Sequence, residues 1–199
     1  MRAREEMLRR VRDALGPSRT SPEIPRTYAT VGTLSESDRV ALLVDRLFDY
    51  RAAVVDAREG DVSAAIGGAL PEGRVLHAPG VPPKWLPGGT VADDGTLGPR
   101  DLDSVAGVVT GSVTAIALTG TIVLDGGPLC GRRALSLVPD LHVCVVRSEE
   151  IVETVPEALA RVDPVRPLTF VSGPSATSDI ELNRVEGVHG PRTLVVVLA

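Results

Sequence analysis

The sequence predicts an α/β fold, a three-layer α/β/α Rossmann-like domain in which helices cover both faces of a parallel sheet. Three observations predict it. Short runs of Val, Leu, Ile and Ala alternate with segments whose apolar residues recur at helical spacing. The apolar runs are continuous, as is typical of strands buried on both faces. The chain has 199 residues, a length that suits one domain with a substantial core.

The first 33 residues are expected to stand apart from the α/β/α domain, which we place at 34–199. A first helix is indicated by apolar residues at Met7, Leu8, Val11, Ala14 and Leu15. Gly16-Pro17 ends it, and residues 16–33 contain three prolines and little periodicity, which predicts an extended arm. Two interpretations remain open: the helix packs on its own domain, or it docks on a neighbouring subunit of a homo-oligomer.

The elements of the first half alternate. A helix capped by Ser35 or Ser37 is followed by a strand in "RAAVVDA", a helix in "DVSAAIGGAL" and a strand in "RVLHAP". Residues 79–100 form a long loop rich in proline and glycine, which is often functional when it is this long. Its Trp85 either closes over a ligand together with Lys84 or fills a hole in the core.

The second half continues with more strands and short helices. "AIAL" and "TIVL" predict two strands joined by a turn at Thr119-Gly120. A short helix in "RRALSLVPD" precedes a buried strand, "LHVCVV". Thr154 and Glu157 fit a capping box for the next helix. The strands "RPLTFVSG" and "RTLVVVLA" complete the sheet.

Composition excludes several classes of function. The net charge is −5 and only 3% of the residues are aromatic, which argues against a nucleic-acid surface. The two cysteines, Cys130 and Cys144, are fourteen residues apart and form no C-x-x-C pair. We therefore predict neither a zinc site nor an iron–sulfur cluster, and no cofactor. Cys144 is expected to be buried and Cys130 to be more exposed.

The ends and apolar runs of the sequence predict a cytoplasmic protein. The first fifteen residues are too charged for a signal peptide. No run approaches the roughly 18–20 apolar residues of a membrane span. We therefore expect no membrane span.

Three loops that follow strands have the composition of a ligand site. Ligands of open parallel sheets bind at the carboxyl ends of the strands, where backbone N–H groups are available. We predict that the loops at 110–121 and 172–178 form one pocket. The predicted ligand-binding residues are Thr110, Gly111, Thr119, Gly120, Thr121, Gly173, Pro174, Ser175, Thr177, Asp179, Glu181, His189 and Arg192. The sequence leaves the identity of any catalytic residue open.

The loop "SGPSATSDIE" (172–181) is the best of the three candidates. Gly173 lets the chain turn, Pro174 stiffens the turn, and Ser175 offers a hydroxyl beside backbone N–H groups that can hold a phosphate or carboxylate. Asp179 and Glu181 are expected to bind a hydroxyl group, to hold His189 or Arg192 in place, or to cap a helix. The alternative is a capped strand-to-helix turn without a ligand.

The segment "GVHGPR" (187–192) is predicted to form the second wall of the same anion site. Arg192 can offer two N–H groups to a carboxylate or phosphate. His189 is either an acid–base group near its usual pKa or a structural residue that donates to a backbone carbonyl.

The motifs "TGTIVLDGG", "GRRALSLVPDLHVCVV", "SGPSATSDIE" and "GVHGPR" together resemble the lactate-utilisation protein C family, also called the LUD domain. The resemblance covers most of the chain and is densest from 107 to 199. It implies a fold similar to that of the sugar-phosphate isomerases, CoA transferases and formyltetrahydrofolate cyclo-ligase. It also implies two iron–sulfur proteins as partners in the oxidation of L-lactate to pyruvate.

The resemblance predicts an accessory, non-redox component that binds a small anion or a nucleotide-like ligand. Family members commonly carry an acidic residue before the Thr-Gly turn, in a pattern like A-E-T-G-T, whereas this chain has Leu118 there. The alternative function is a stand-alone enzyme of the isomerase and cyclo-ligase superfamily that acts on a phosphorylated or CoA-like substrate.

Overall fold

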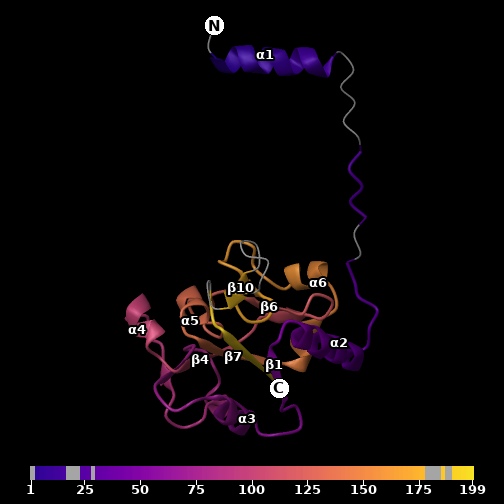
Figure 1. Ribbon diagram of the computed structural model, residues 1–199. Coiled ribbons are helices and arrows are strands. Elements are labelled where there is room, and N and C mark those ends of the chain that lie inside the picture. Colours follow the sequence, from indigo (N-terminus) through magenta and orange to yellow (C-terminus); the bar gives the residue numbers. More distant parts are fainter. Residues whose placement is uncertain (1–2, 17–22, 28–29, 178–184, 187–189) are drawn as a thin grey trace.

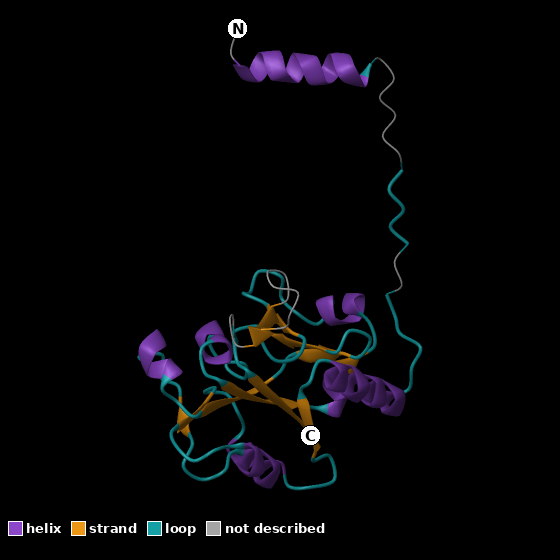
Figure 2. Cartoon of the chain, in the orientation of Figure 1, coloured by secondary structure: helices purple, strands orange, loops and turns teal. Residues whose placement is uncertain are grey.

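A computed structural model describes residues 3–16, 23–27, 30–177, 185–186 and 190–199. Its centre is a six-stranded sheet in which every pair of neighbouring strands is parallel (Figures 1 and 2). The strand order is β1 (Ala53–Asp56), β12 (Thr193–Leu198), β7 (Leu141–Val146), β4 (Gly107–Gly111), β2 (Val75–His77) and β3 (Val91–Ala92). The predicted fold class is confirmed.

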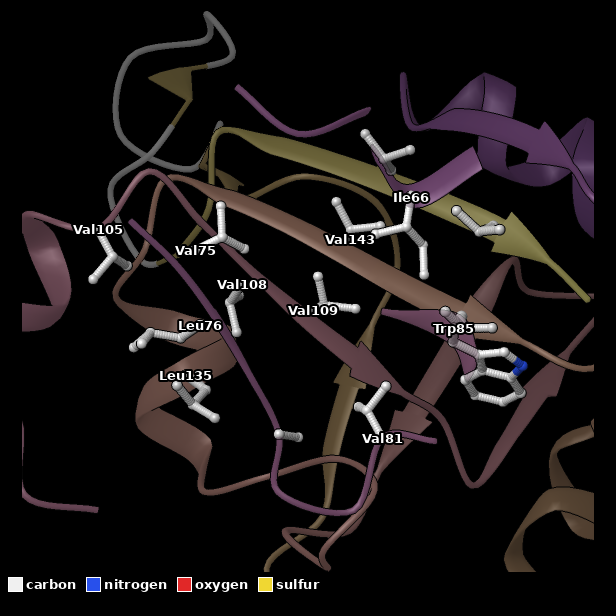
Figure 3. Close-up of a cluster of buried hydrophobic side chains, with 14 of the residues drawn as sticks. Ile66, Val75, Leu76, Val81, Trp85, Val105, Val108, Val109, Leu135 and Val143 are labelled. Carbon is white, nitrogen blue, oxygen red and sulfur yellow. The ribbon is translucent and has the colours of Figure 1, made fainter. Parts of the chain in front are cut away.

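Helices cover one face of this sheet. They are α3 (Val62–Ala69), the 3₁₀ turn η1 (Pro83–Trp85), α4 (Pro99–Asp103) and α5 (Arg133–Leu137). Figure 3 shows the core between them and the sheet, with Ile66 of α3, Val143 of β7 and Leu135 of α5. Trp85 is buried in the same cluster. Of the two interpretations of Trp85, the structure supports the one in which it fills the core.

The opposite face is covered by α2 (Glu36–Asp49) and by a second sheet that the sequence analysis did not anticipate. This sheet has the order β8 (Ile151–Val152), β5 (Thr114–Ile116), β6 (Thr121–Leu124) and β9 (Thr169–Val171). The predicted turn at Thr119-Gly120 joins β5 to β6 as an antiparallel pair. The two strands pack on the face of the parallel sheet as part of a separate layer.

The remaining elements complete the second layer. The turn η2 (Ser148–Glu150) leads into β8, and α6 (Val155–Leu159) covers the outer face of the small sheet through Ala158. The predicted capping box of Thr154 and Glu157 is present at the start of α6. A short pair, β10 (Ala176–Thr177) and β11 (Val185–Glu186), follows β9.

The N-terminal helix α1 (Ala3–Leu15) has no buried residue and lies apart from the body (Figure 1). The chain joins the body at Gly32, whose N–H donates to Glu157 Oε1 at 3.0 Å. The backbone N–H groups of Thr33 and Leu34 donate to Glu153 Oε2. The hydrogen bond from Gly32 is the main cause of a lowered pKa of Glu157, and hydrogen bonds from Thr154 and from the N–H of Glu153 add to it. No described helix is both long and apolar enough to cross a membrane.

Both cysteines are buried, so the prediction that Cys130 is the more exposed one is wrong. The physical reason is the loop before it: the N–H of Gly80 donates to Pro128 O and the N–H of Gly111 to Leu129 O. These bonds draw residues 128–130 over the ends of β2 and β4. Burial raises the pKa of both thiols to about 12.

His142 of β7 is a buried histidine that stays neutral. Its Nε2 lies 2.8 Å from the hydroxyl oxygen of Thr110 on β4. Burial lowers the pKa of His142 to about 4. The unfolded chain takes up this proton near the ordinary histidine pKa of about 6.5. The stabilisation is therefore complete above pH 6.5 and is lost as the pH falls toward 4.

We predict that the free energy of unfolding falls by on the order of 1 kcal/mol per pH unit between about pH 6.5 and 4 because of His142 alone. Urea unfolding at several pH values measures it. The control His142→Leu/Thr110→Val replaces both partners by apolar side chains. The wild type should lose stability more steeply than this control, and parallel profiles would contradict the assignment.

Candidate functional site

The described parts of the two segments predicted as walls of one site, 172–177 and 190–192, come together in the structure. The N–H of Ser175 donates to Pro191 O at 2.8 Å. A β-carbon at Gly190 would lie 3.4 Å from Cβ of Ser175. The turn after β9 and the segment that enters β12 are therefore in direct contact, although they are fifteen positions apart in the sequence.

A groove with a volume of about 240 Å³ lies between these segments and α5. Its described lining consists of Ser136, Leu137, residues 169–175, Gly190 and Pro191. The lining offers serine and threonine side chains beside Phe170 and two prolines, and none of these described residues is ionisable. The described lining thus offers hydroxyl groups and apolar surface to a ligand.

The groove lies at the amino edge of the six-stranded sheet, where α5 leads into β7 and Pro191 leads into β12. In Figure 1, β12 runs from the side of β10 toward the C-terminus. The expectation that the site lies at the carboxyl ends of the parallel strands is therefore wrong for this groove. The reason is that β9, whose carboxyl end does open into it, belongs to the small sheet.

Two glycines shape the turns beside the groove. Gly120 has φ +59° and Gly173 has φ +87°, conformations that a side chain makes costly. A β-carbon would come within 2.6 Å of Arg46 Cβ at Gly120 and within 2.5 Å of Tyr50 Cβ at Gly173. Both turns are therefore packed tightly against the end of α2.

A chain of hydroxyl groups connects the two turns. The hydroxyl oxygen of Thr121 lies 2.8 Å from that of Thr119 and 2.8 Å from that of Ser172. Ser172 lines the groove, so Thr119 and Thr121 lie directly behind its wall. At this point the loops 110–121 and 172–178, which were predicted to form one pocket, are in contact through Thr121 and Ser172.

Thr110 and Gly111 lie elsewhere. Thr110 is fully buried inside the sheet, where its hydroxyl contacts His142. Gly111 lies under Leu129, whose side chain a β-carbon at Gly111 would meet at 2.6 Å. Neither residue lines the groove, because β4 ends at the carboxyl edge of the sheet while Thr119–Thr121 lie at the other end of β5. No residue of 110–121 is among the described residues that line the groove, so these residues do not form the single pocket predicted for 110–121 and 172–178.

Arg192 comes directly after Pro191, which lines the groove. Its side chain forms an ion pair with Asp140, the residue before β7. Its Nε donates to Asp140 Oδ1 at 2.6 Å, and both side chains are more than half exposed. The hydrogen bond raises the pKa of Arg192, so the guanidinium keeps its charge. Because the pair is exposed, a ligand that competes with Asp140 would meet little resistance.

The other predicted residues are not placed by the structure. Asp179, Glu181 and His189 lie outside the described residues, and Thr177 is described only by its backbone in β10. Their roles stay predictions. Within the described part of the chain, no three His, Cys, Asp or Glu side chains gather as a metal site would require.

The α5 side of the groove was not predicted from the sequence. Ser136 and Leu137 line it, yet they belong to a helix that the sequence places far from residue 173. No signal in the sequence pairs them. Phe170 is 47% exposed in β9, where its neighbours Thr169 and Val171 are half-buried.

The carboxyl edge of the large sheet is closed by the chain itself. Besides the hydrogen bonds of residues 128–129, Arg132 makes two hydrogen bonds to the carboxylate of Asp93, at 2.7 and 2.9 Å. Asp93 is buried, so this pair is desolvated on one side. The loop therefore occupies the crevice between β2 and β4, which is where open α/β sheets commonly bind ligands.

A larger cavity, of about 580 Å³, lies at the carboxyl end of β1. Its described lining is Asp56, Arg58, Glu59 and Gly60. Arg58 is paired with Asp56, a hydrogen bond that lowers the pKa of this carboxyl group. The cavity presents two carboxylates and one arginine that is already paired, so it is a poor site for an anion. The groove at the amino edge of the sheet is the better candidate.

Comparison with known proteins identifies the family. The sequence model of the LUD domain matches residues 85–199, which is more than half of the chain. The chain belongs to the LUD domain family. The resemblance stated from the sequence motifs is thereby confirmed, and the match includes every described residue that lines the groove.

Relatives agree with this assignment. A protein of Deinococcus radiodurans named lactate utilization protein C is 44% identical over 98% of this chain and 95% of its own length. Lactate utilization protein C 1 of Bacillus mycoides is 35% identical over 45% of this chain and 42% of its length. The crystal structure of a DUF162 family protein from Deinococcus radiodurans has a TM-score of 0.71 and 40% identity, and the match covers 83% of this chain and 99% of that one.

We predict that Gly173→Ala lowers the free energy of unfolding by about 2–4 kcal/mol, because it adds a clash with Tyr50 to a strained positive φ. Gly88→Ala is the control, since its β-carbon would meet no atom within 4 Å and its φ is not positive. Denaturant unfolding compares the two. Equal stability of the two variants would show that the turn is not held against α2.

Proposed function

We propose that this chain is an accessory, non-redox component of lactate utilisation that binds a small anion or a nucleotide-like ligand in the amino-edge groove and acts together with iron–sulfur proteins. The observation that carries the proposal is its 44% identity, over nearly the whole length of both chains, to a protein named lactate utilization protein C. The groove supplies a place for the ligand.

The chemistry of the groove supports an anion as the ligand. Ser172 and Ser175 bring hydroxyl groups to one wall, and the glycines beside them allow a close approach of the backbone. Gly190 and Pro191 belong to the opposite wall, and Arg192 is the next residue in the sequence. The guanidinium of Arg192 can exchange its hydrogen bond with Asp140 for hydrogen bonds to a carboxylate or phosphate of the ligand. Its N–H groups then keep a partner when the ligand binds.

Arg192→Ala is expected to weaken anion binding by about 1.5–3 kcal/mol, or roughly tenfold to a hundredfold, because a charge-assisted hydrogen bond is lost. The melting temperature without ligand should barely change, since the ion pair with Asp140 is exposed. Calorimetric titration of both proteins with lactate, pyruvate, phosphate and nucleotides measures this.

Asp140→Asn is the matched variant. It breaks the same ion pair but leaves the guanidinium in place and removes a negative charge beside the ligand. Anion binding should therefore become equal to or tighter than that of the wild type. If both variants lose stability equally and bind the anions as the wild type does, Arg192 has a structural role only and the groove is not an anion site.

A second prediction tests the physiological role. Cells that lack this chain should grow poorly with L-lactate as the carbon source and normally with glucose. Growth should return when the wild-type chain is supplied. Normal growth on lactate without the chain would contradict the proposal.

Affinity purification of the chain from cells grown on lactate tests its partners. Iron–sulfur proteins should co-purify, and the eluate should show their visible absorption. Lactate oxidation should need the partners, whereas the purified chain alone should show none. Turnover of a phosphorylated or CoA-like substrate by the purified chain would instead favour the stand-alone enzyme.

A further inference from the structure

Helix α1 presents an apolar face that nothing covers in the described part of the chain. Met7, Val11 and Leu15 recur at helical spacing on one side and are 67%, 50% and 61% exposed. The other side carries ion pairs of Glu6 with Arg9 and Arg10. An isolated helix of 13 residues is marginal in water, so α1 needs a packing partner to persist.

A matching apolar surface lies on the body, beside the point where the N-terminal segment leaves it. Val155 and Leu159 are one turn apart on α6 and are 39% and 50% exposed. Leu118, whose N–H donates to Glu153 O, is 47% exposed. We call these three residues the α6 patch. Glu153 also binds the backbone of Thr33 and Leu34, at 2.5 and 2.7 Å.

We propose that two copies of this chain exchange their N-terminal helices, so that α1 of each copy packs on the α6 patch of the other. Each segment leaves its body beside the patch that receives the helix of the second copy. A reciprocal exchange therefore places both patches near one two-fold axis and closes as a dimer.

The length and composition of the connecting segment fit an exchange. Sixteen residues, 16–31, separate Leu15 from Gly32, and this length of extended chain spans up to about 50 Å. Its sequence contains three prolines, which favour an extended spacer over a chain that folds back sharply. A second copy is therefore a better acceptor for α1 than the body from which the segment starts.

Charge also favours docking on a second body over pairing of two α1 helices. Residues 1–33 contain seven basic and four acidic residues, whereas residues 34–199 contain fourteen basic and twenty-two acidic ones. The N-terminal segment is thus positive and the remainder strongly negative. The two attract each other, whereas two N-terminal segments repel.

The first test alters α1 in the full-length chain. Met7→Ser/Val11→Ser places two serines on the apolar side, and the control Glu5→Ser/Arg12→Ser places two on the polar side without a change in net charge. Light scattering after size exclusion should give twice 20.9 kDa for the wild type and the control. The apolar variant should raise the dissociation constant of the dimer at least about tenfold. A monomeric wild type, or equal dissociation constants for both variants, would overturn the proposal.

The second test alters the receiving surface. Val155→Ser/Leu159→Ser should dissociate the dimer, whereas Val165→Ser, at a position that is 90% exposed and outside the patch, should not. Thermal unfolding of each variant should remain cooperative, so that loss of the dimer is not loss of the fold. A patch variant that stays dimeric would show that α1 binds elsewhere.

Mixing the α1 variant with the patch variant separates exchange from its alternatives. The Met7→Ser/Val11→Ser chain has a wild-type α6 patch, and the Val155→Ser/Leu159→Ser chain has a wild-type α1. A mixed dimer of the two therefore retains one intact contact between α1 and the α6 patch. Differently labelled chains should therefore associate in the mixture although each is monomeric alone. If no mixed dimer forms, α1 docks on its own body or pairs with another α1, and the exchange is refuted.

Discussion

The parallel pairing of β7 with β12 is the constraint on which the rest of the structure depends. All six residues of β12 are in register with β7, from Thr193 opposite Leu141 to Leu198 opposite Val146. Successive side chains of these strands point to opposite faces, so Val143 and Val145 enter the helical core while Cys144 and Val146 enter the core shared with the small sheet. Both layers are therefore anchored on the same two strands, and burial on both faces explains why neither strand alternates in polarity.

The pairing of β7 with β12 sets the position of the candidate site. Asp140 directly precedes β7 and Arg192 directly precedes β12. The backbone N–H of Thr193 donates to Asp140 O. Gly190 and Pro191 thereby face the end of α5, and the turn after β9 closes the groove from the small sheet. The ordinary ligand crevice at the other edge is filled by the loop that Arg132 fastens to Asp93. A ligand site at the amino edge is the arrangement that these two facts leave open.

Tyr50 is the point at which the groove and the second layer are coupled. It ends α2, and the turns at Gly120 and Gly173 both pack against it. Glycine is required at these turns because each has a positive φ and almost no room for a β-carbon. The hydroxyl groups of Thr121 and Ser172 lie 2.8 Å apart beside these turns, so the end of α2, the two turns and the groove wall are in continuous contact.

The sequence by itself determined the class of fold, because continuous apolar runs and helical spacing depend only on which faces are buried. It also predicted most elements, among them the capping box of Thr154, and it predicted that "SGPSATSDIE" and "GVHGPR" lie together, a prediction that the contact of Ser175 with Pro191 supports. Only the tertiary structure decided that β5 and β6 form a separate sheet, that Cys130 is buried, that Thr110 belongs to the core and that Ser136 lines the groove. Each of these depends on contacts between residues distant in sequence. A local pattern shows that a residue needs burial or a turn, but the partner that supplies it is chosen by the packing of the whole chain.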